Sequence, residues 1–400
     1  MLRHLSAAAD VPWTLLSANR SIEVPATVPG NAHLALIGAG LLLGDPLYRY
    51  NEREWAWAAL EDWTFRANVS LGHVEAAGLT ALEMEGVDTA ASVWVNGRRL
   101  DGDARDAFVR WSWDLPPALL RAGANCIEVR FTAARAYARA QKAAYPYEVP
   151  SSYYPVYSEP SARNFIRKPP YDFGWDWGPS FMPTGITGGV TLRDDAPRLR
   201  ELAISQAWDD AGGVRVRVAG RLGAGAREPV RLRVELCYPS CAAPIERAQA
   251  ASGWATPPRS SCAEAGGEAE FGAAELHITA PRRWWPRGHG PQTLYEVRAA
   301  LARAGGAVGD GADGAWLSRR IGLRRVELVE DPAPPPTEGA PAGTSFFFRV
   351  NGVPVFAKGA NMIPLDVFET RVTAQYTRWA RARAELRPRP PLQRCRCAES

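Results

Sequence analysis

Apolar and polar residues alternate with a period of two over many short stretches of this chain. This spacing predicts β-strands with one buried face, and the apolar positions are rich in β-branched and aromatic residues. The clearest examples are residues 64–71 (TFRANVSL), 79–100, 125–134 (NCIEVRFTAA), 213–220 (GVRVRVAG) and 230–238 (VRLRVELCY). Asn96-Gly97 predicts a hairpin turn that needs positive φ. Within residues 1–195, only residues 134–144 have a helix-like pattern. The chain is therefore predicted to be mostly β.

The same pattern indicates more than one domain. Residues 1–195 contain one group of predicted strands, and residues 196–330 contain a second group that fits a small β-sandwich. Within the second group, residues 244–270 are rich in Ala, Gly, Ser and Glu, which predicts an inserted surface loop. Residues 331–343 (DPAPPPTEGAPAG) have the composition of a linker.

The positive charge is concentrated at the C-terminus. Residues 378–400 contain seven Arg and two Glu, a net charge of 7 − 2 = +5, whereas the whole chain carries +4, so the remainder sums to 4 − 5 = −1. A basic tail can bind nucleic acid or anionic lipid. Here the apolar pattern stops and prolines appear at 388, 390 and 391, which favours altered splicing, a frameshift or a gene-model error. Residues 380–400 are interpreted as an aberrant tail, and no nucleic-acid partner is expected.

The residues that best indicate function are Gly174-Trp175-Asp176-Trp177-Gly178-Pro179. Indole faces stack on the apolar face of a pyranose, and a carboxylate between two indoles can accept hydrogen bonds from two hydroxyls. The flanking glycines favour a tight loop that projects these side chains. The alternative is a turn with two core tryptophans and an aspartate that caps backbone amides.

Several motifs, in order along residues 12–379, resemble the β-mannosidases of family 2 of the retaining glycoside hydrolases. The quoted stretch is preceded by Asn164-Phe165-Ile166-Arg167-Lys168 and followed by Thr184-Gly185-Ile186. Further matches are Val28-Pro29-Gly30 with His33, Glu85-Gly86-Val87-Asp88-Thr89, Trp284-Trp285-Pro286-Arg287-Gly288-His289-Gly290, Arg325-Val326-Glu327-Leu328, Phe348-Arg349-Val350-Asn351-Gly352 and Lys358-Gly359-Ala360-Asn361.

The resemblance implies a fold for each segment. Residues 1–195 would be a galactose-binding-like β-sandwich (jelly roll) and residues 196–330 an immunoglobulin-like β-sandwich. Residues 331–379 would be a linker followed by the first strand and helix of a truncated (β/α)₈ barrel, which needs about 250 residues when complete. A barrel strand without its neighbours leaves exposed apolar surface, so residues from about 345 onward are expected to be poorly packed.

The resemblance also implies an activity. The family hydrolyses terminal non-reducing β-D-mannose residues of β-mannosides, as in glycoprotein N-glycan degradation, with a nucleophilic carboxylate and an acid/base carboxylate. Both glutamates lie on the barrel, the acid/base in an Asn-Glu pair. The only such pair here is Asn51-Glu52, in the first domain. No catalytic residue is therefore assigned, and the chain alone is expected to be inactive. A β-mannoside oligosaccharide is the expected partner, and the residues expected to contact it are Trp175, Asp176, Trp177 and Asn361.

Other features narrow the class of protein. The histidines form no metal-ligand motif and no phosphate-binding loop is present, so neither metal nor cofactor is expected. No stretch of 18 apolar residues exists, and no membrane partner is expected. Cys237, Cys241 and Cys262 are close enough in sequence for one disulfide. No oligomeric state is predicted.

The resemblance favours a lysosomal or secreted protein, although residues 1–13 lack the apolar core of a signal peptide. Asn19 and Asn68 each begin a short N-glycosylation motif. Two alternatives remain for the function: a non-catalytic carbohydrate-binding protein, and a fragment of another family-2 glycosidase such as a β-glucuronidase or an exo-glucosaminidase.

Overall fold

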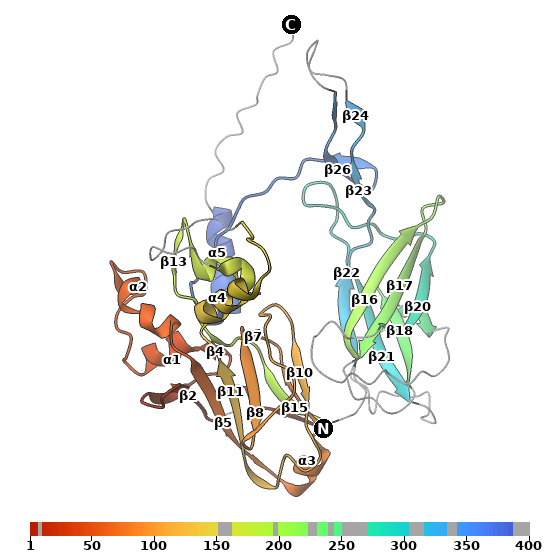
Figure 1. The fold of residues 1–400 in the computed structure, drawn as a ribbon. Coiled ribbons are helices and arrows are strands. Elements are labelled where there is room, and N and C mark those ends of the chain that lie inside the picture. Colours follow the sequence, from red (N-terminus) through yellow and green to blue (C-terminus); the bar gives the residue numbers. More distant parts are fainter. Residues whose placement is uncertain are drawn as a thin grey trace. The chain divides into compact units, whose positions relative to one another are not determined.

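The computed structural model describes residues 1–6, 10–150, 162–194, 199–222, 230–238, 244–249, 270–303, 316–333 and 342–386 (Figure 1). The chain forms two compact units. The N-terminal unit contains Leu2–Arg193 and the residues from Met362 onward, and the central unit contains Met1 and Asp194–Asn361. Strands predominate in both, which confirms the predicted fold class. No helix among the described residues is long and apolar enough to cross a membrane.

The N-terminal unit is built on a six-stranded antiparallel sheet with the order β3-β2-β5-β11-β8-β9. Its strands are β2 (Trp13–Ser17), β3 (Glu23–Ala26), β5 (Trp63–Leu71), β8 (Ala91–Val95), β9 (Arg98–Arg99) and β11 (Gly123–Phe131). Asn96 and Gly97, with φ of 49° and 80°, connect β8 to β9. The predicted hairpin turn is thus confirmed.

Two smaller antiparallel sheets complete this unit. One has the order β1-β15-β6-β10, with β1 (Leu2–His4), β6 (Ala81–Met84), β10 (Trp111–Asp114) and β15 (Val190–Arg193). The other has the order β4-β14-β7, with β4 (Gly30–Asn31), β7 (Val87–Asp88) and β14 (Gly185–Ile186).

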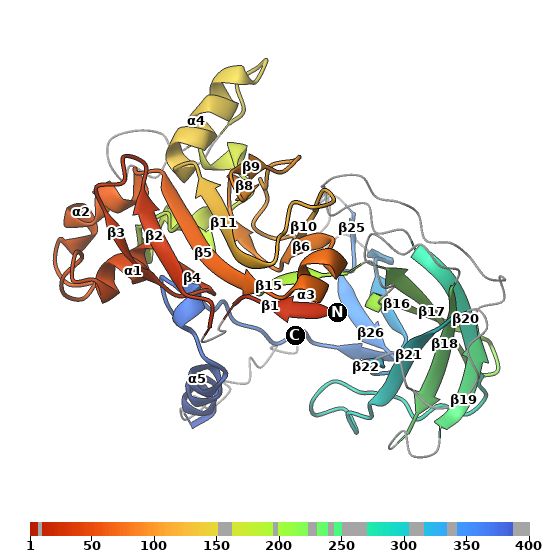
Figure 2. The same cartoon turned by 90° about the horizontal axis from the view of Figure 1, so that it is seen from below.

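The core of the N-terminal unit lies between the six-stranded sheet and the four-stranded sheet β1-β15-β6-β10. Phe65 and Val69 of β5, Leu82 of β6 and Trp111 and Trp113 of β10 belong to one buried cluster. Along β5, buried residues alternate with more exposed ones, as the period-two pattern predicts. Figure 2 shows β5 and β11 side by side in the larger sheet. The unit is therefore a β-sandwich held by apolar burial between its sheets.

Short helices connect the strands of this unit. They are α1 (Ala32–Gly38), α2 (Asn51–Glu54), α3 (His73–Gly78) and α4 (Ala134–Ala144), with the 3₁₀ turns η1 (Ala56–Ala59), η2 (Arg163–Phe165) and η3 (Pro170–Asp172). Asn31 caps α1, because its Oδ1 accepts a hydrogen bond from the Leu34 amide at 3.0 Å. The helix predicted over residues 134–144 is confirmed as α4.

The expectation of poor packing from about residue 345 onward holds for many apolar side chains, since Phe346, Phe356 and Met362 are 72%, 81% and 80% exposed, and it is wrong for Phe368. The segment after Met362 contains η4 (Glu369–Arg371) and α5 (Ala374–Leu386), and α5 continues past Trp379. Phe368 is fully buried in the core of the N-terminal unit, with its ring centroid 5.3 Å from that of His33 and 5.4 Å from that of Phe181. This aromatic contact fixes residues 362–371 to the sandwich.

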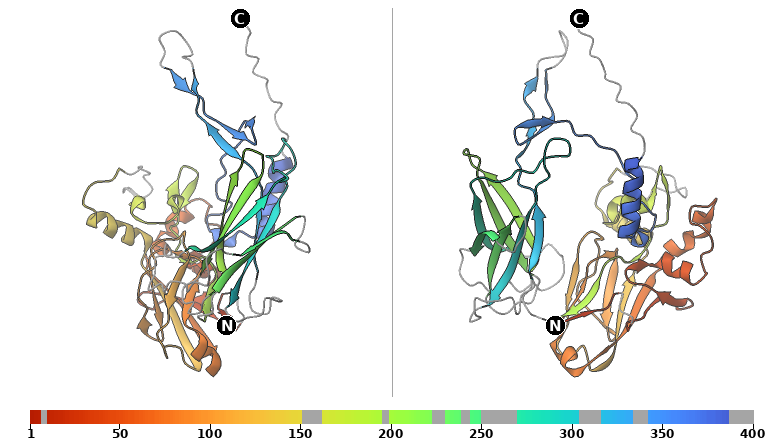
Figure 3. Two further views of the ribbon diagram at one scale, coloured as in Figure 1. Left: turned by 90° about the vertical axis from the view of Figure 1, so that its right-hand side faces the viewer. Right: turned by 180° about the vertical axis from the view of Figure 1, so that it is seen from behind.

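The central unit is a second β-sandwich (Figures 1 and 3). One sheet has the order β16-β17-β20, with β16 (Leu199–Trp208), β17 (Val214–Leu222) and β20 (Glu270–Ile278). The other has the order β19-β18-β21-β22, with β18 (Val230–Cys237), β19 (Pro244–Gln249), β21 (Tyr295–Arg303) and β22 (Leu317–Ile321). Three and four strands are the numbers typical of an immunoglobulin-like sandwich.

Strand pairing corrects the start of the surface loop predicted over residues 244–270. Residues 244–249 form β19 and pair with β18, and residues 250–269 lie outside the described residues. The ends of the predicted linker 331–343 pair as β24 (Pro332–Ala333) and β25 (Gly343–Thr344), and residues 334–341 lie outside the described residues, so the linker stays a prediction. Composition alone does not indicate such pairing with a neighbouring strand.

A further small sheet of the central unit contains β23 (Val326–Val329), β26 (Phe347–Val350) and β27 (Val353–Val355). Asn351 and Gly352, both with positive φ, connect β26 to β27 in a hairpin. β27 pairs antiparallel with β26, and residues 356–368 contain no strand. An antiparallel strand pair followed by a stretch without a strand differs from the parallel strands of a barrel. The predicted start of a barrel is therefore not confirmed by the described residues.

Replacing Phe368 by alanine is expected to lower the unfolding free energy of the N-terminal unit by about 3–5 kcal/mol, because it empties a fully buried aromatic site. Urea unfolding of the 400-residue chain measures the loss. Phe346→Ala is the control, since that side chain is 72% exposed and its removal should leave the midpoint unchanged. Equal, small effects of the two substitutions would contradict the docking of residues 362–371.

Candidate functional site

The Trp-Asp-Trp stretch forms a tight hairpin on the N-terminal unit. β12 (Phe173–Trp175) pairs with β13 (Gly178–Ser180), Trp175 lies opposite Gly178, and Asp176 and Trp177 form the two-residue turn. All three candidate side chains are exposed, with Trp175 and Trp177 each 37% exposed. This geometry presents two indoles and one carboxylate together at the surface, and it differs from the alternative in which both indoles are core residues.

The two glycines that flank the motif have different roles. Gly174 has φ +94°, a conformation that side chains disfavour, whereas Gly178 does not have positive φ. A Cβ atom added at Gly178 would meet nothing within 4 Å. The expectation that both glycines permit the tight loop is therefore met by the backbone of Gly174 only.

Each indole is supported by a neighbouring side chain. The guanidinium carbon of Arg163 lies 4.7 Å from the ring centroid of Trp175, and its Nη1 donates to the Gly174 carbonyl at 3.4 Å. The Tyr171 ring lies 5.6 Å from that of Trp177 at 44°. Cation–π and aromatic contacts of this kind restrict the side-chain rotamers. The indoles are thus held in place while part of their surface stays accessible.

A buried ammonium lies below the hairpin. Lys168 is fully buried, and its Nζ contacts the carboxylates of Asp88 and Asp172, the latter at 2.8 Å, and donates to the Pro183 carbonyl at 2.6 Å. Burial opposes the charged form, but the two carboxylates outweigh it and raise the pKa of Lys168. Burial, with a smaller opposing effect of Lys168, raises the pKa of Asp172 to about 7.

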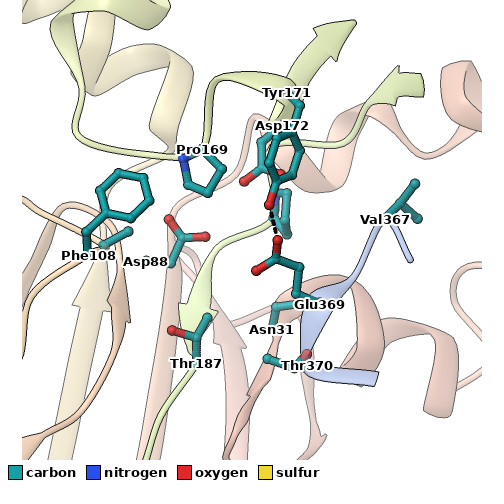
Figure 4. A pocket seen from close by; sticks show the side chains of 12 residues that line it. Asn31, Asp88, Phe108, Pro169, Tyr171, Asp172, Thr187, Val367, Glu369 and Thr370 are labelled. Atoms are coloured by element: carbon teal, nitrogen blue, oxygen red, sulfur yellow. Dashed lines mark hydrogen bonds between the residues drawn. The ribbon is translucent and has the colours of Figure 1, made fainter. Parts of the chain in front are cut away.

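Two cavities lie beside the hairpin. The larger, of about 320 Å³, is lined by Asn31, Asp88, Ala107, Phe108, Pro169, Tyr171, Asp172, Pro183, Thr187, Val367, Glu369 and Thr370. Figure 4 shows the Glu369 carboxylate directed at the Tyr171 hydroxyl, which donates a hydrogen bond to it. Burial and this carboxylate raise the pKa of Tyr171. The cavity wall is therefore polar and acidic on one side.

The smaller cavity, of about 190 Å³, adjoins the hairpin itself. Trp177, Gly178 and Pro179 form one wall, residues 363–367 form another, and Leu47, Tyr171, Asp172 and Phe181 complete the lining. Trp175 and Asp176 line neither of the two cavities. Of the three predicted contact residues, Trp177 thus lines one of these two cavities.

His33 is an unusual feature of the core beneath these cavities. It is 1% exposed, and neither ring nitrogen has a hydrogen-bond partner among the described residues. It packs against Phe181 and Phe368. Burial, and secondarily the charge of Lys168, lowers the pKa of His33 to about 3. The imidazole is therefore a neutral apolar-packed ring near neutral pH, and it is not placed to act on a ligand.

The remaining predicted sites are described one by one. Asn361 is exposed and belongs to the central unit, and its contact with a sugar stays a prediction. Asn19 and Asn68 are both exposed, as glycosylation would require. Cys237 is disulfide-bonded, and Cys241 and Cys262 lie outside the described residues. The described residues contain no cluster of His, Cys, Asp or Glu that could hold a metal ion.

Sequence reasoning assigned no role to the residues that support the hairpin, which are Arg163, Lys168, Tyr171, Asp172 and Glu369. Lys168 and Asp88 do fall within motifs that carry the family resemblance, and Asp172 follows Lys168 by four residues. A buried Lys-Asp pair at this spacing could have been suspected. The sequence around Arg163 and Glu369 did not indicate a role for either residue, because folding alone brings each of them to its partner.

Comparison with known proteins identifies this architecture. Residues 13–188 match the family described as "Glycosyl hydrolase 2 galactose-binding domain-like". Beta-mannosidase of Rattus norvegicus is 30% identical over 375 residues, which cover 91% of this chain and 39% of the relative. Beta-mannosidase of Bos taurus is 31% identical over 377 residues, which cover 92% of this chain and 39% of that relative. The solved beta-D-mannosidase of Dictyoglomus thermophilum is 29% identical with a TM-score of 0.78, covering 96% of this chain and 43% of that one.

This chain is a homologue of the β-mannosidases. It spans about 39% of the length of the curated relatives it matches. The exo-chitosanase of Amycolatopsis orientalis, at 17% identity and a TM-score of 0.59, shares the fold. The galactose-binding-like domain and the homology confirm the family resemblance seen in the motifs of the sequence.

The asymmetry of the two glycines in this β-mannosidase homologue gives a paired prediction. Gly174→Ala should destabilise the N-terminal unit by about 1–3 kcal/mol, because alanine is strained at φ +94°. Gly178→Ala should change stability by less than about 0.5 kcal/mol. Urea unfolding compares the two variants. The assignment fails if Gly178→Ala proves as costly as Gly174→Ala.

The pKa of His33 predicts an acid sensitivity. In the unfolded chain the ring protonates below its ordinary pKa of 6.5, whereas in the folded state it stays neutral down to about 3. His33 therefore contributes a loss of stability as the pH falls from 6.5 towards 3, of about 2 kcal/mol between pH 7 and pH 5, and the raised pKa of Asp172 acts against it. His33→Leu should remove the His33 contribution, so the unfolding free energy of this variant relative to that of the original chain should rise by about 2 kcal/mol from pH 7 to pH 5, which urea unfolding at the two pH values measures.

The matched control for this experiment is His73→Leu, because His73 is exposed at the start of α3. It should keep the pH dependence of the original chain. An unchanged pH dependence in His33→Leu would show that the ring does not stay neutral in the fold.

Proposed function

We propose that this chain provides the two β-sandwiches of a β-mannosidase that removes terminal non-reducing β-D-mannose from β-mannosides, including those of N-glycans. The observation that carries the proposal is the hairpin that exposes Trp175, Asp176 and Trp177 in a homologue of the β-mannosidases. Asp176 would accept hydrogen bonds from hydroxyls of the terminal mannose, and the indoles would form the wall of the pocket. A lysosomal or secreted location belongs to the same proposal.

The cleavage in such an enzyme is a retaining reaction of two carboxylates. One forms a glycosyl-enzyme intermediate, and the other protonates the leaving oxygen and then activates water. We propose that neither carboxylate is among residues 1–400. The sole Asn-Glu pair, Asn51-Glu52, begins the short helix α2 of the N-terminal unit, away from the strand position expected of the acid/base. The exposed hairpin would act on substrate binding and orientation.

A fusion tests the proposal. Residues 1–386 replace the corresponding N-terminal part of the Dictyoglomus thermophilum beta-D-mannosidase, whose structure matches 96% of this chain. The fusion should release p-nitrophenol from p-nitrophenyl β-D-mannoside, and residues 1–400 alone should not. Asp176→Ala in the fusion should lower kcat/KM about 100-fold, because charged hydrogen bonds to sugar hydroxyls are lost in the transition state.

Asp101→Ala is the control, since Asp101 is an exposed aspartate elsewhere on the N-terminal unit. It should leave kcat/KM within about twofold, the effect of a neutral surface change. Near-normal kcat/KM in Asp176→Ala, with the fold intact, would leave the hairpin a structural element only. Turnover by purified residues 1–400 would overturn the proposed absence of the catalytic carboxylates.

A further inference from the structure

One ammonium group connects both ends of the hairpin segment to the sandwich. Asp172 immediately precedes β12, and Pro183 follows β13 by three residues. Asp88 lies in β7 of the sandwich. The Nζ atom of Lys168 contacts all three, through the two carboxylates and the Pro183 carbonyl at 2.6 Å.

Backbone contacts at the same place close the base of the hairpin. The Met182 amide donates to the Asp172 carbonyl at 2.9 Å, and the Ser180 hydroxyl donates to it at 3.4 Å. The two strands themselves contribute only the pairs Phe173–Ser180 and Trp175–Gly178. A ladder this short is marginal without attachments to a larger structure. The position of the hairpin therefore depends on what holds its base.

The three charged groups of this attachment are shielded from water. Asp88 and Asp172 are 7% and 8% exposed, and the Lys168 side chain is fully buried. The ammonium is the group that joins the two carboxyls, because its Nζ atom contacts both of them and the Pro183 carbonyl. Loss of the cation would remove these contacts, and with them the link between the start of β12 and β7.

Lys168 itself lines neither of the cavities beside the hairpin, so it acts on a ligand only through other residues. We propose that Lys168 is a positioning residue that sets the place of Trp175, Asp176 and Trp177 on the N-terminal unit. The consequence for sugar recognition rests on the proposed function of the hairpin, whereas the attachment of the hairpin does not.

Hydrogen exchange of the intact 400-residue chain tests the attachment. In Lys168→Met, amides of residues 172–182 should exchange at least about tenfold faster, since local opening of the hairpin becomes easier. Amides of β5 and β11 should exchange as before. Uniformly faster exchange, or an unchanged hairpin, would overturn the proposal in favour of a general contribution to core stability.

Arg193→Met is the matched control. Arg193 forms a comparably buried ion pair with Glu83, between β15 and β6, and the two side chains are 4% and 10% exposed. Its loss should lower the melting temperature without selective exchange in residues 172–182. If Lys168→Met does not fold, Asp172→Asn replaces it, because this variant removes one charge and keeps the Lys168–Asp88 contact. Selective exchange of the hairpin, severalfold faster, is again expected, and its absence overturns the proposal.

A second measurement uses the fusion that tests the proposed function. Lys168→Met should lower kcat/KM at least about tenfold, and Asp176→Ala should then add much less than it does alone, because a displaced hairpin no longer brings Asp176 to the sugar. Full additivity would contradict positioning. If Asp176→Ala alone has no effect, the proposed function fails, and hydrogen exchange still decides the role of Lys168.

Discussion

A hairpin of two short strands cannot hold exposed indoles in place by its own backbone pairing. The attachment to a large, buried sandwich supplies the rigidity that the ladder lacks. In this protein that attachment is electrostatic at the base, through Lys168 with Asp88 and Asp172, and aromatic nearer the tip, through Arg163 on Trp175 and Tyr171 on Trp177. The apolar core provides the fixed body, and these contacts transmit its position to the exposed side chains.

The segment after Met362 contributes to the same arrangement. Phe368 is buried against His33 and Phe181, and one residue later Glu369 accepts the hydrogen bond of the Tyr171 hydroxyl. The Tyr171 ring also packs against Trp177. Residues far apart in the sequence therefore meet around the hairpin. The cavity walled by Trp177 on one side and residues 363–367 on the other exists because of this contact.

Much of the fold could be predicted from sequence, because burial of one strand face imposes a period of two. β5 and β11 were recognisable for this reason, and α4 was recognisable by its different period. β19 and the pair β24–β25 were not, since their pairing depends on neighbouring strands and not on an apolar pattern. Phe368 was also missed: an aromatic residue after a proline-containing stretch does not reveal which core receives it.

The candidate site also contains residues that could be predicted from the sequence and residues that could not. Trp175, Asp176 and Trp177 were recognisable because carbohydrate recognition has a compositional signature, and their exposure agrees with such a role. Their supports were not recognisable, because Lys168, Arg163 and Glu369 act through partners that are distant in sequence. Two buried groups of the N-terminal unit, Asp172 and His33, respond to pH in opposite directions. As the pH falls from 7 towards 4, protonation of Asp172 favours the folded state, whereas the neutral ring of His33 increasingly disfavours it below 6.5. The acid response of the N-terminal unit is therefore a difference between two opposing effects, and a substitution at either residue exposes the other.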